Sequence, residues 1–396
     1  MPHCARSTLR LFATFTLCAT FVLPNTAPAQ DTAPASAPPL GFHLAHLQTV
    51  EPLIEQAIAE RKMPGCVLVI GRRGGIGWYK AYGHRSVEPE RIAMTTDTVF
   101  DLASLTKPIA TAMSVMLLVQ REQLRLDTPV AQLIPDFAAQ GKQAITIQHL
   151  LTHTSGLIAD NALSDYEHGR DEALRRIYTL RPVEPEVGKR FIYSDVNFIL
   201  LGELIHQTTR QNLHQFTQKE LFQPLGMHDT GFLPRAELRP RTAPTQQRAG
   251  QWLQGEVHDP RADKLGGIAG HAGLFATAAD LARFAQHLLA DGTTAAPRIL
   301  SSDTLTLMTR SYDVPRGIRG LGWDKKSPYS SNRAMGMSDA AYGHGGFTGT
   351  VLWIDPQLDL FYIFLSNRVH PDGKGNVNAL AGQIGTIAVQ ALAPPR

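Results

Sequence analysis

Cysteine is scarce in this chain of 396 residues, which has three, at positions 4, 18 and 66. The first two lie in an N-terminal segment that we expect to be removed, so Cys66 would be the only thiol of the mature chain. An internal disulfide is then excluded. A chain of this length can bury a core large enough to hold its fold without one.

A strong excess of charge of either sign is also lacking. Lys and Arg number 38 and Asp and Glu number 35, which gives a formal net charge of +3 at pH 7. This balance offers no electrostatic basis for binding nucleic acid or an anionic membrane surface. We therefore expect neither as a partner, and the sequence shows no evident internal repeat.

The N-terminus has the features of a secretory signal. Arg6 and Arg10 precede an apolar stretch over 11–23, and Ala27-Pro28-Ala29 precedes Gln30. This order predicts a signal peptide over residues 1–29 and an exported protein, periplasmic or secreted. The apolar stretch is shorter than the ~20 residues that cross a bilayer, so no stable membrane anchor is expected. Retention of the segment as an anchor stays open.

The folded domain is expected over 42–392. Residues 30–41 are rich in Ala and Pro and poor in large apolar side chains, which predicts a flexible leader. Apolar spacing predicts a helix over 47–61, and the runs 66–70 and 76–82 predict a β-hairpin around a glycine-rich turn. No Gly-Lys-Ser/Thr follows those glycines, so a phosphate-binding loop is rejected.

The C-terminal part predicts a second hairpin and a closing helix. The runs 350–354 and 360–365 have strand character, and 377–392 has helical apolar spacing. Residues 101–300 are mostly helical in pattern. Hairpins near both chain ends therefore predict an α+β fold, in which distant segments complete one antiparallel sheet and an α-rich lobe over about 101–300 is inserted between them.

Ser104 and Lys107 form a Ser-x-x-Lys motif at the predicted start of an apolar helix. At this spacing the two side chains share one face. A serine hydroxyl is a poor nucleophile at its own pKa, and a lysine one turn away can activate it if the lysine pKa is lowered. Lys107 is the only lysine with a serine three residues before it. The alternative is a capped core helix with an exposed lysine.

Two further motifs follow in the chain. Tyr193-Ser194-Asp195 precedes an apolar helical run over 199–205, and His344-Gly345-Gly346 leads into a predicted strand. Taken singly, the tyrosine could be a half-buried packing residue and the glycines a strand entry beside a solvated histidine. With all three motifs in order, the chain resembles the penicillin-recognising serine hydrolases, which include penicillin-binding proteins, class C β-lactamases and related esterases. The segments 147–157 and 266–275 extend the resemblance around the expected cleft.

The resemblance implies a β-lactamase/transpeptidase-like fold and a mechanism through an acyl-enzyme. Ser104 would be the nucleophile, Lys107 its base or proton shuttle, and Tyr193 the phenol that relays a proton to the leaving group, with a pKa lowered by nearby cations. The backbone N–H groups of Ser104 and Phe347 would form the oxyanion hole. Glycines 345 and 346 would let substrate lie along the edge strand.

The chain departs from its relatives at two substrate-binding positions. Members that handle β-lactams usually have Asn where Asp195 stands and often Lys where His344 stands. An ionised Asp cannot donate a hydrogen bond, and His is mostly neutral at pH 7. Each change should weaken β-lactam binding by about 1–3 kcal/mol, so an efficient β-lactamase is not expected. Asn197 could supply an amide, but its spacing predicts that it points elsewhere.

Three functions stay open. They are a D-alanyl-D-alanine carboxypeptidase acting on peptidoglycan peptides, which we favour, a carboxylesterase with the same machinery, and a catalytically weak sensor of muropeptides or β-lactams. Fold resemblance cannot choose among these substrates. No cofactor is expected, and the spacing of His258, Asp259 and His271 matches no compact metal-ligand pattern. His149, His153 and His271 are expected to be hydrogen-bonded loop residues.

Overall fold

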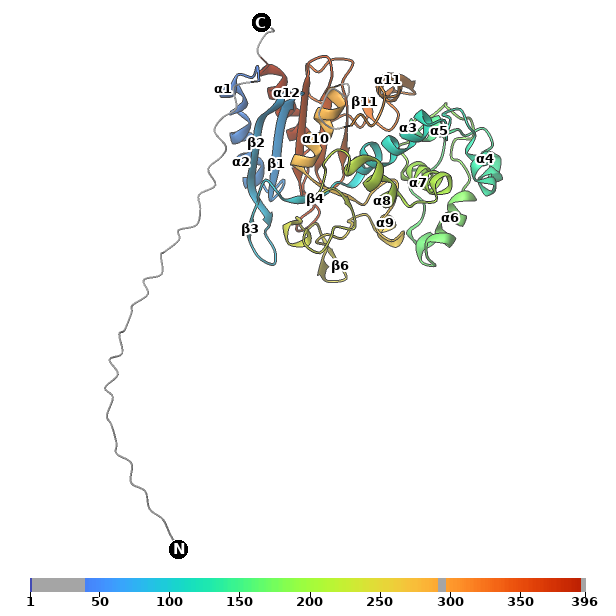
Figure 1. Cartoon of the computed structure of the whole chain (residues 1–396), viewed down its shortest axis with the longest axis horizontal. Helices are drawn as coiled ribbons and strands as arrows, with labels where there is room; N and C mark the ends of the chain where they lie inside the picture. Colours follow the sequence, from blue (N-terminus) through green and yellow to red (C-terminus); the bar gives the residue numbers. More distant parts are fainter. Residues whose placement is uncertain (2–39, 291–296, 393–396) are drawn as a thin grey trace, which may run out of the picture. The chain divides into compact units, whose positions relative to one another are not determined.

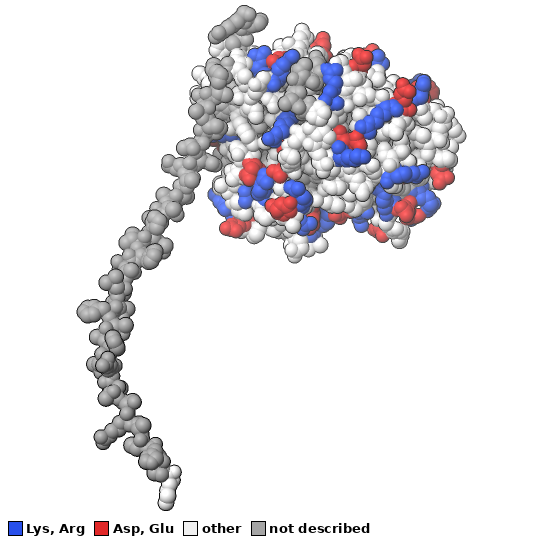
Figure 2. Space-filling view, viewed as in Figure 1, with Lys and Arg blue, Asp and Glu red and all other residues white. Residues whose placement is uncertain are grey.

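The computed structural model describes Met1 and residues 40–290 and 297–392. The predicted signal, apart from Met1, and the predicted leader up to residue 39 lie outside the described residues. None of the helices in the described part of the chain is long and apolar enough to cross a membrane. On the face shown in Figure 2, acidic and basic side chains are interspersed, in keeping with the balanced composition.

Nine of the described strands form one sheet, in the order β3-β2-β1-β14-β13-β12-β11-β10-β9. Every neighbouring pair is antiparallel, and β1 pairs with β14, so the two predicted hairpins meet at the centre of the sheet (Figure 1). The α+β fold expected from the sequence is therefore confirmed. The strands are β1 Gly65–Arg72, β2 Gly75–Ser86, β3 Ile92–Ala93, β9 Tyr312–Val314, β10 Gly317–Arg319, β11 Asp324–Lys326, β12 Tyr342–Gly346, β13 Thr350–Asp355 and β14 Leu360–Ser366.

Side chains of β1 alternate between two buried layers because helices cover both faces of the sheet. Leu68 and Ile70 join the core beneath α2 (Val50–Ala59) and α12 (Asn378–Gln390), whereas Val67 and Val69 join the core shared with the helical region. The predicted helix over 47–61 is divided in the structure, because a separate short helix, α1, covers Leu44–Leu47. The predicted closing helix is α12.

The interval 101–300 is mostly helical but does not form a separate lobe throughout. Within it, α10 (Ala278–Leu289) packs against β1 and β14 of the main sheet. The other elements here are η1 Ala103–Leu105, η2 Lys107–Ala112, α3 Met113–Gln120, α4 Val130–Leu133, η3 Pro135–Gly141, α5 Ile147–Leu151, η4 Leu163–Tyr166, α6 Arg170–Tyr178, α7 Asp195–Thr209, α8 Leu213–Thr217, η5 Gln218–Phe222, β5 Gly231–Phe232, η6 Arg239–Arg241, β6 Gln247–Arg248, β7 Gln251–Trp252, α9 Pro260–Lys264 and β8 Leu274–Thr277. A small sheet joins β8 to β5 and to β4 (Val99–Asp101), and α11 covers Ser302–Thr309.

Gly270 brings a loop into contact with the backbone of α7. A Cβ atom at this position would lie 1.9 Å from Phe198 O, and the Gly270 carbonyl accepts a hydrogen bond from Thr111 Oγ1 at 2.6 Å. We expect Gly270→Ala to lower the free energy of unfolding by about 3 kcal/mol because backbone must move to admit the methyl group. Urea denaturation measures this. Gly74→Ala is the control, since a Cβ there meets only Leu40 Cδ2 at 3.8 Å. Equal stability of the two variants would contradict the packing described.

Candidate functional site

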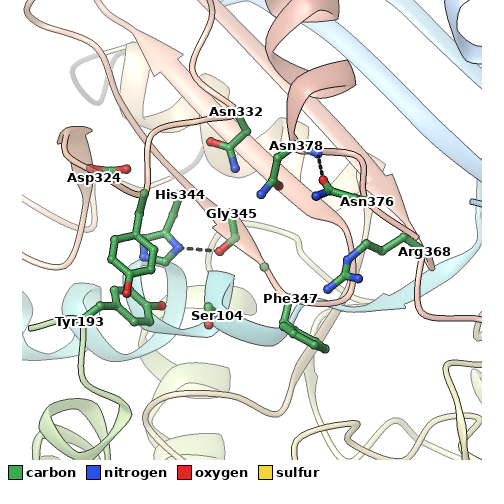
Figure 3. Close-up of a pocket in the computed structure, with 12 residues that line it drawn as sticks. Ser104, Tyr193, Asp324, Asn332, His344, Gly345, Phe347, Arg368, Asn376 and Asn378 are labelled. Carbon is green, nitrogen blue, oxygen red and sulfur yellow. Dashed lines mark hydrogen bonds between the residues drawn. The ribbon is translucent and has the colours of Figure 1, made fainter. Parts of the chain in front are cut away.

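A polar cleft lies between β12 and the segment that carries Ser104. Its volume is about 280 Å³. Figure 3 shows the side chains that surround it, with Tyr193 and Arg368 on opposite sides of Ser104. The lining residues are Ser104, Tyr193, Asp324, Tyr329, Asn332, His344, Gly345, Gly346, Phe347, Arg368, Asn376 and Asn378. All three predicted motifs therefore contribute to the lining of the cleft. Ser104 comes from the first motif, Tyr193 from the second, and His344, Gly345 and Gly346 from the third.

The turn that presents Ser104 is held by a buried carboxylate. Asp101 accepts hydrogen bonds from the backbone N–H groups of Ala103 at 2.8 Å and His258 at 2.7 Å. These bonds hold Ala103 at a φ of 46°, directly before Ser104. Burial raises the pKa of Asp101 to about 6. The sequence analysis did not identify Asp101 as a positioning residue, because one acid before a serine is no recognisable pattern.

Lys107 is fully buried and contacts Ser104 directly. The chain winds as a 3₁₀ turn through Ser104 and then as a π-helical segment from Lys107, in place of a regular α-helix. Lys107 Nζ lies 3.0 Å from Ser104 Oγ, 3.1 Å from His271 O and 2.6 Å from Asp195 Oδ1. The alternative of an exposed lysine is therefore excluded.

The charge state of Lys107 is set by its neighbours. Burial by itself would lower the pKa of the amine, but Asp195 and Tyr193 outweigh burial and hold the pKa above its ordinary value. Lys107 is then an ammonium at neutral pH, with its three N–H groups directed at Ser104, His271 and Asp195. It acts as a donor to the serine oxygen in this state.

Tyr193 lies immediately before α7 and packs between aromatic rings. Its ring centroid is 4.6 Å from that of His153 and 4.7 Å from that of Tyr329. The flanking backbone is fixed, because Ser194 N–H donates to His153 Nδ1 at 3.0 Å. Burial raises the pKa of Tyr193, and this outweighs the opposing effect of Lys107. Lys107 thus acts in the expected direction, but the expected net lowering of this pKa is wrong.

His344 is buried on β12, the strand beside the cleft. Its Nδ1 lies 2.7 Å from Gly345 O, and burial together with Arg319 holds its pKa well below the usual value, so the ring is neutral. Arg319 itself is fully buried and pairs with Asp324 at 3.2 Å. A permanent cation therefore lies near His344, on β10, and no sequence motif predicts it.

Gly345 and Gly346 of β12 are required by packing. A Cβ on Gly346 would lie 2.3 Å from Leu102 O, and one on Gly345 would lie 2.3 Å from Asn332 Nδ2. The turn after β12 is bonded to the chain before Ser104, since Thr348 Oγ1 donates to Asp101 O at 2.7 Å. These contacts hold the Phe347 backbone beside Ser104 in the cleft.

Several other expectations concern residues near the cleft. Asn197 is fully buried and its Oδ1 accepts from Ser155 Oγ at 2.7 Å, so it points away from the cleft as expected. His149 caps α5 through Thr146, which also fits its expected structural role. His153 is a hydrogen-bonded residue too, but it contacts Tyr193.

Asp195, Asp259 and His271 lie closer together than their spacing in the sequence suggests. One ligand atom from each lies within 4.8 Å of the others, and His271 Nε2 is 2.9 Å from Asp259 Oδ1. That oxygen also accepts the N–H groups that begin α9, while Asp195 Oδ1 contacts Lys107. One oxygen of each acid is thus already bonded by protein groups.

Six lining residues were not identified from the sequence: Asp324, Tyr329, Asn332, Arg368, Asn376 and Asn378. They come from β11, from the loop before β12, from the segment between β14 and α12 and, for Asn378, from the first residue of α12. None of the six belongs to a recognised motif. Spatial convergence on Ser104 is the only signal that joins them.

Comparisons with known proteins support the family that the sequence resembles and its fold. The sequence matches the family model "Beta-lactamase" over residues 50–385. It is 31% identical to "N-acetylmuramyl-L-alanine amidase" of Bacillus subtilis (strain 168), with 86% of each chain covered. It is 30% identical to "Putative D-alanyl-D-alanine carboxypeptidase" of Escherichia coli (strain K12), with 83% of this chain and 84% of that protein covered.

Solved structures share the fold. A penicillin-binding protein homolog from Caulobacter crescentus superposes with a TM-score of 0.70 at 20% identity, covering 88% of this chain and 98% of the other. EstCE1, a hydrolase with promiscuous acyltransferase activity, gives 0.69 at 22% identity, covering 88% and 99%. The family match and the two relatives at 30–31% identity show the family of this chain as well as its fold. The chain belongs to the β-lactamase family and is a serine hydrolase of the penicillin-recognising superfamily.

Proposed function

We propose that this protein hydrolyses its substrate through an acyl-enzyme ester on Ser104. The observation that carries the proposal is the 3.0 Å contact between the buried Lys107 amine and the Ser104 hydroxyl, which lines the cleft. A buried lysine without function would be expected to spend its donors on carboxylates and carbonyls alone. This one directs a donor at a serine oxygen that substrate can reach.

In the proposed acylation, Ser104 Oγ bonds to the substrate carbonyl carbon while the serine proton passes to Lys107. Lys107 must first release a proton, and Asp195 Oδ1 at 2.6 Å is the acceptor in direct contact. The bond between the carbonyl carbon and the leaving group breaks as the Tyr193 phenol protonates that group, and Tyr193 recovers a proton from Lys107. Asp195 then returns its proton to Lys107, so the net result moves the serine proton to the leaving group. Water then cleaves the ester by the reverse route.

The backbone N–H groups of Ser104 and Phe347 are proposed to hold the oxyanion of the tetrahedral state. Two hydrogen bonds support this pairing: Thr348 Oγ1 donates to Asp101 O at 2.7 Å, and Thr350 Oγ1 donates to Leu102 O at 3.0 Å. They join the turn after β12 to the chain before Ser104. The two N–H groups thereby keep a fixed separation through the reaction.

The proposed substrates are peptidoglycan peptides that end in D-alanine, and the proposed site of action is outside the cytoplasm. The carboxypeptidase name of the E. coli relative supports cleavage of the D-alanyl-D-alanine bond. The amidase name of the B. subtilis relative supports peptidoglycan as the polymer that supplies the substrate. The signal-like N-terminus supports export.

An esterase is the second candidate, and Asp195 favours it. The Asp195 carboxylate is engaged with Lys107 and has no hydrogen to donate to an acylamide carbonyl. An ester substrate without an acylamide does not need that donor. The same machinery would then be limited to esters.

A matched pair of substrates separates these functions. One is an N-acetylmuramyl pentapeptide ending in D-Ala-D-Ala, and the other replaces its last amide by an ester to D-lactate. We expect Ser104-dependent release of D-alanine and of D-lactate, followed by mass spectrometry. Release of D-lactate alone would favour the esterase, and cleavage at the muramyl amide would favour the amidase bond. Binding without any product would contradict catalysis and leave a sensor.

Asp195→Asn should move the pH dependence of activity. The carboxylate helps to hold the pKa of Lys107 above its ordinary value, so the neutral base forms only at high pH. Removing it leaves burial less opposed, the pKa of Lys107 falls, and the rising limb of kcat/KM shifts to lower pH. A pH–rate profile with an activated ester measures this.

Asp160→Asn is the matched control for this profile. Asp160 lies near Asp195 but pairs with Arg261 at 3.7 Å rather than with Lys107. Removing its carboxylate should leave the rising limb of kcat/KM at the same pH as in the wild type. An unshifted limb in Asp195→Asn would contradict the role given to the Lys107–Asp195 pair.

A further inference from the structure

One acidic and one basic side chain line the cleft, and they differ in their ion-pair partners. Asp324 is paired with the buried Arg319 at 3.2 Å and accepts a hydrogen bond from Ser330 Oγ at 2.8 Å. Arg368 has no carboxylate within ion-pair distance among residues 40–290 and 297–392. The cleft therefore contains one uncompensated cation.

Arg368 is held in place rather than free in solvent. Its Nη1 donates to Gly375 O at 2.5 Å, and its guanidinium lies 4.5 Å from the ring centroid of Phe347. The residue is half-buried, and burial lowers the pKa of the guanidinium while leaving it charged. A partly desolvated cation without a counter-charge is costly, and an anionic ligand would remove that cost.

Two carboxamides, those of Asn376 and Asn378, line the cleft with the guanidinium. Asn376 Oδ1 accepts the backbone N–H of Asn378 at 3.1 Å, which fixes the first amide and leaves its NH₂ group for other partners. In Figure 3 both asparagines and Arg368 lie on the same side of the cleft. A guanidinium with neighbouring amide donors suits a planar carboxylate, which can accept two parallel hydrogen bonds.

The position of this group relative to Tyr193 decides which part of the substrate it meets. Figure 3 places Tyr193 on one side of Ser104 and Arg368 on the other. The leaving group must lie toward Tyr193 to receive its proton, so the acyl part extends toward Phe347 and Arg368. We propose that Arg368, Asn376 and Asn378 form a carboxylate-binding subsite for the acyl part of the substrate.

This inference rests on the proposed function, because it uses the proposed roles of Ser104 and Tyr193. It narrows the substrate class to acyl groups that carry a carboxylate near the scissile carbonyl. Acidic stem peptides are one such class. Neutral fatty or aryl acyl groups would leave the Arg368 cation unmatched.

Nitrophenyl esters with matched acyl groups test the subsite. One has an acyl chain ending in a carboxylate, and the other carries the methyl ester of that carboxylate. We expect Arg368→Gln to lower the ratio of kcat/KM for the anionic over the neutral ester by about 10- to 100-fold, mainly through KM. Arg310→Gln is the control. Arg310 also stacks on an aromatic ring, at 4.8 Å from the Tyr312 centroid, but it lies outside the cleft.

An equal loss for both esters would overturn the proposal, because it would mean that Arg368 only supports Phe347. A third ester carries its carboxylate on the leaving group. If Arg368→Gln lowers kcat/KM for this ester instead, the assignment of the subsite to the acyl part is overturned. If no ester is turned over in a Ser104-dependent way, the proposed function fails separately. The subsite is then tested by calorimetric binding of the free dicarboxylic acid, and binding that survives Arg368→Gln would overturn it.

Discussion

Ser104→Ala is expected to lower kcat/KM for any substrate of this enzyme by about 10⁴- to 10⁶-fold, to the background of an enzyme that has lost its nucleophile. The change removes one oxygen, which Lys107 Nζ approaches at 3.0 Å. Folding should therefore survive. The effect would lie in the chemical step, with KM little altered.

Steady-state kinetics with an activated ester measures the loss, and circular dichroism confirms the fold. Ser164→Ala is the control, because Ser164 is exposed and does not line the cleft. Turnover by Ser104→Ala within tenfold of the wild type would show that another group forms the covalent bond. The account would then be wrong at its first step.

Lys107→Met is expected to reduce kcat by about 10³-fold or more, because the serine loses the group that carries its proton. Methionine fills a similar volume, so the buried site keeps its packing. Asp195 then loses the ammonium that lies 2.6 Å away, and we expect a loss of about 2 kcal/mol in the free energy of unfolding. Kinetics and urea denaturation measure the two effects.

The double variant Lys107→Met with Asp195→Asn separates chemistry from stability. It removes the unpaired carboxylate, so stability should recover while activity does not. Lys142→Met is the matched control, since Lys142 is also fully buried but donates to Ala139 O and Leu180 O outside the cleft. It should lose stability and keep activity. Recovery of activity in the double variant would refute the proton-carrying role of Lys107.

The sheet could be predicted because its central strands carry strong local patterns. The apolar runs in β1 and β14 and the short connections within their hairpins indicated strands at both chain ends. The strands β9, β10 and β11 at one end of the sheet were not predicted, since each has only three residues, too few to show a period. The packing of α10 against β1 and β14 was not predicted either, because helical periodicity does not say which surface a helix covers.

Within the site, motif residues could be predicted and their electrostatic partners could not. Ser104 and Lys107 are three residues apart, so helical geometry alone brings them together. Asp195 reaches Lys107 only through the packing of α7, and Arg319 reaches His344 across the sheet. The raised pKa of Tyr193 follows from burial, which no local pattern reports.

Intact-mass spectrometry during turnover tests the central claim most directly. The protein would be mixed with a reporter penicillin and, separately, with an activated ester, then quenched in acid and digested. We predict a mass increase equal to the acyl group, mapped to the peptide that contains Ser104 and absent from Ser104→Ala. An adduct on another residue, or one that persists in Ser104→Ala, would contradict the account.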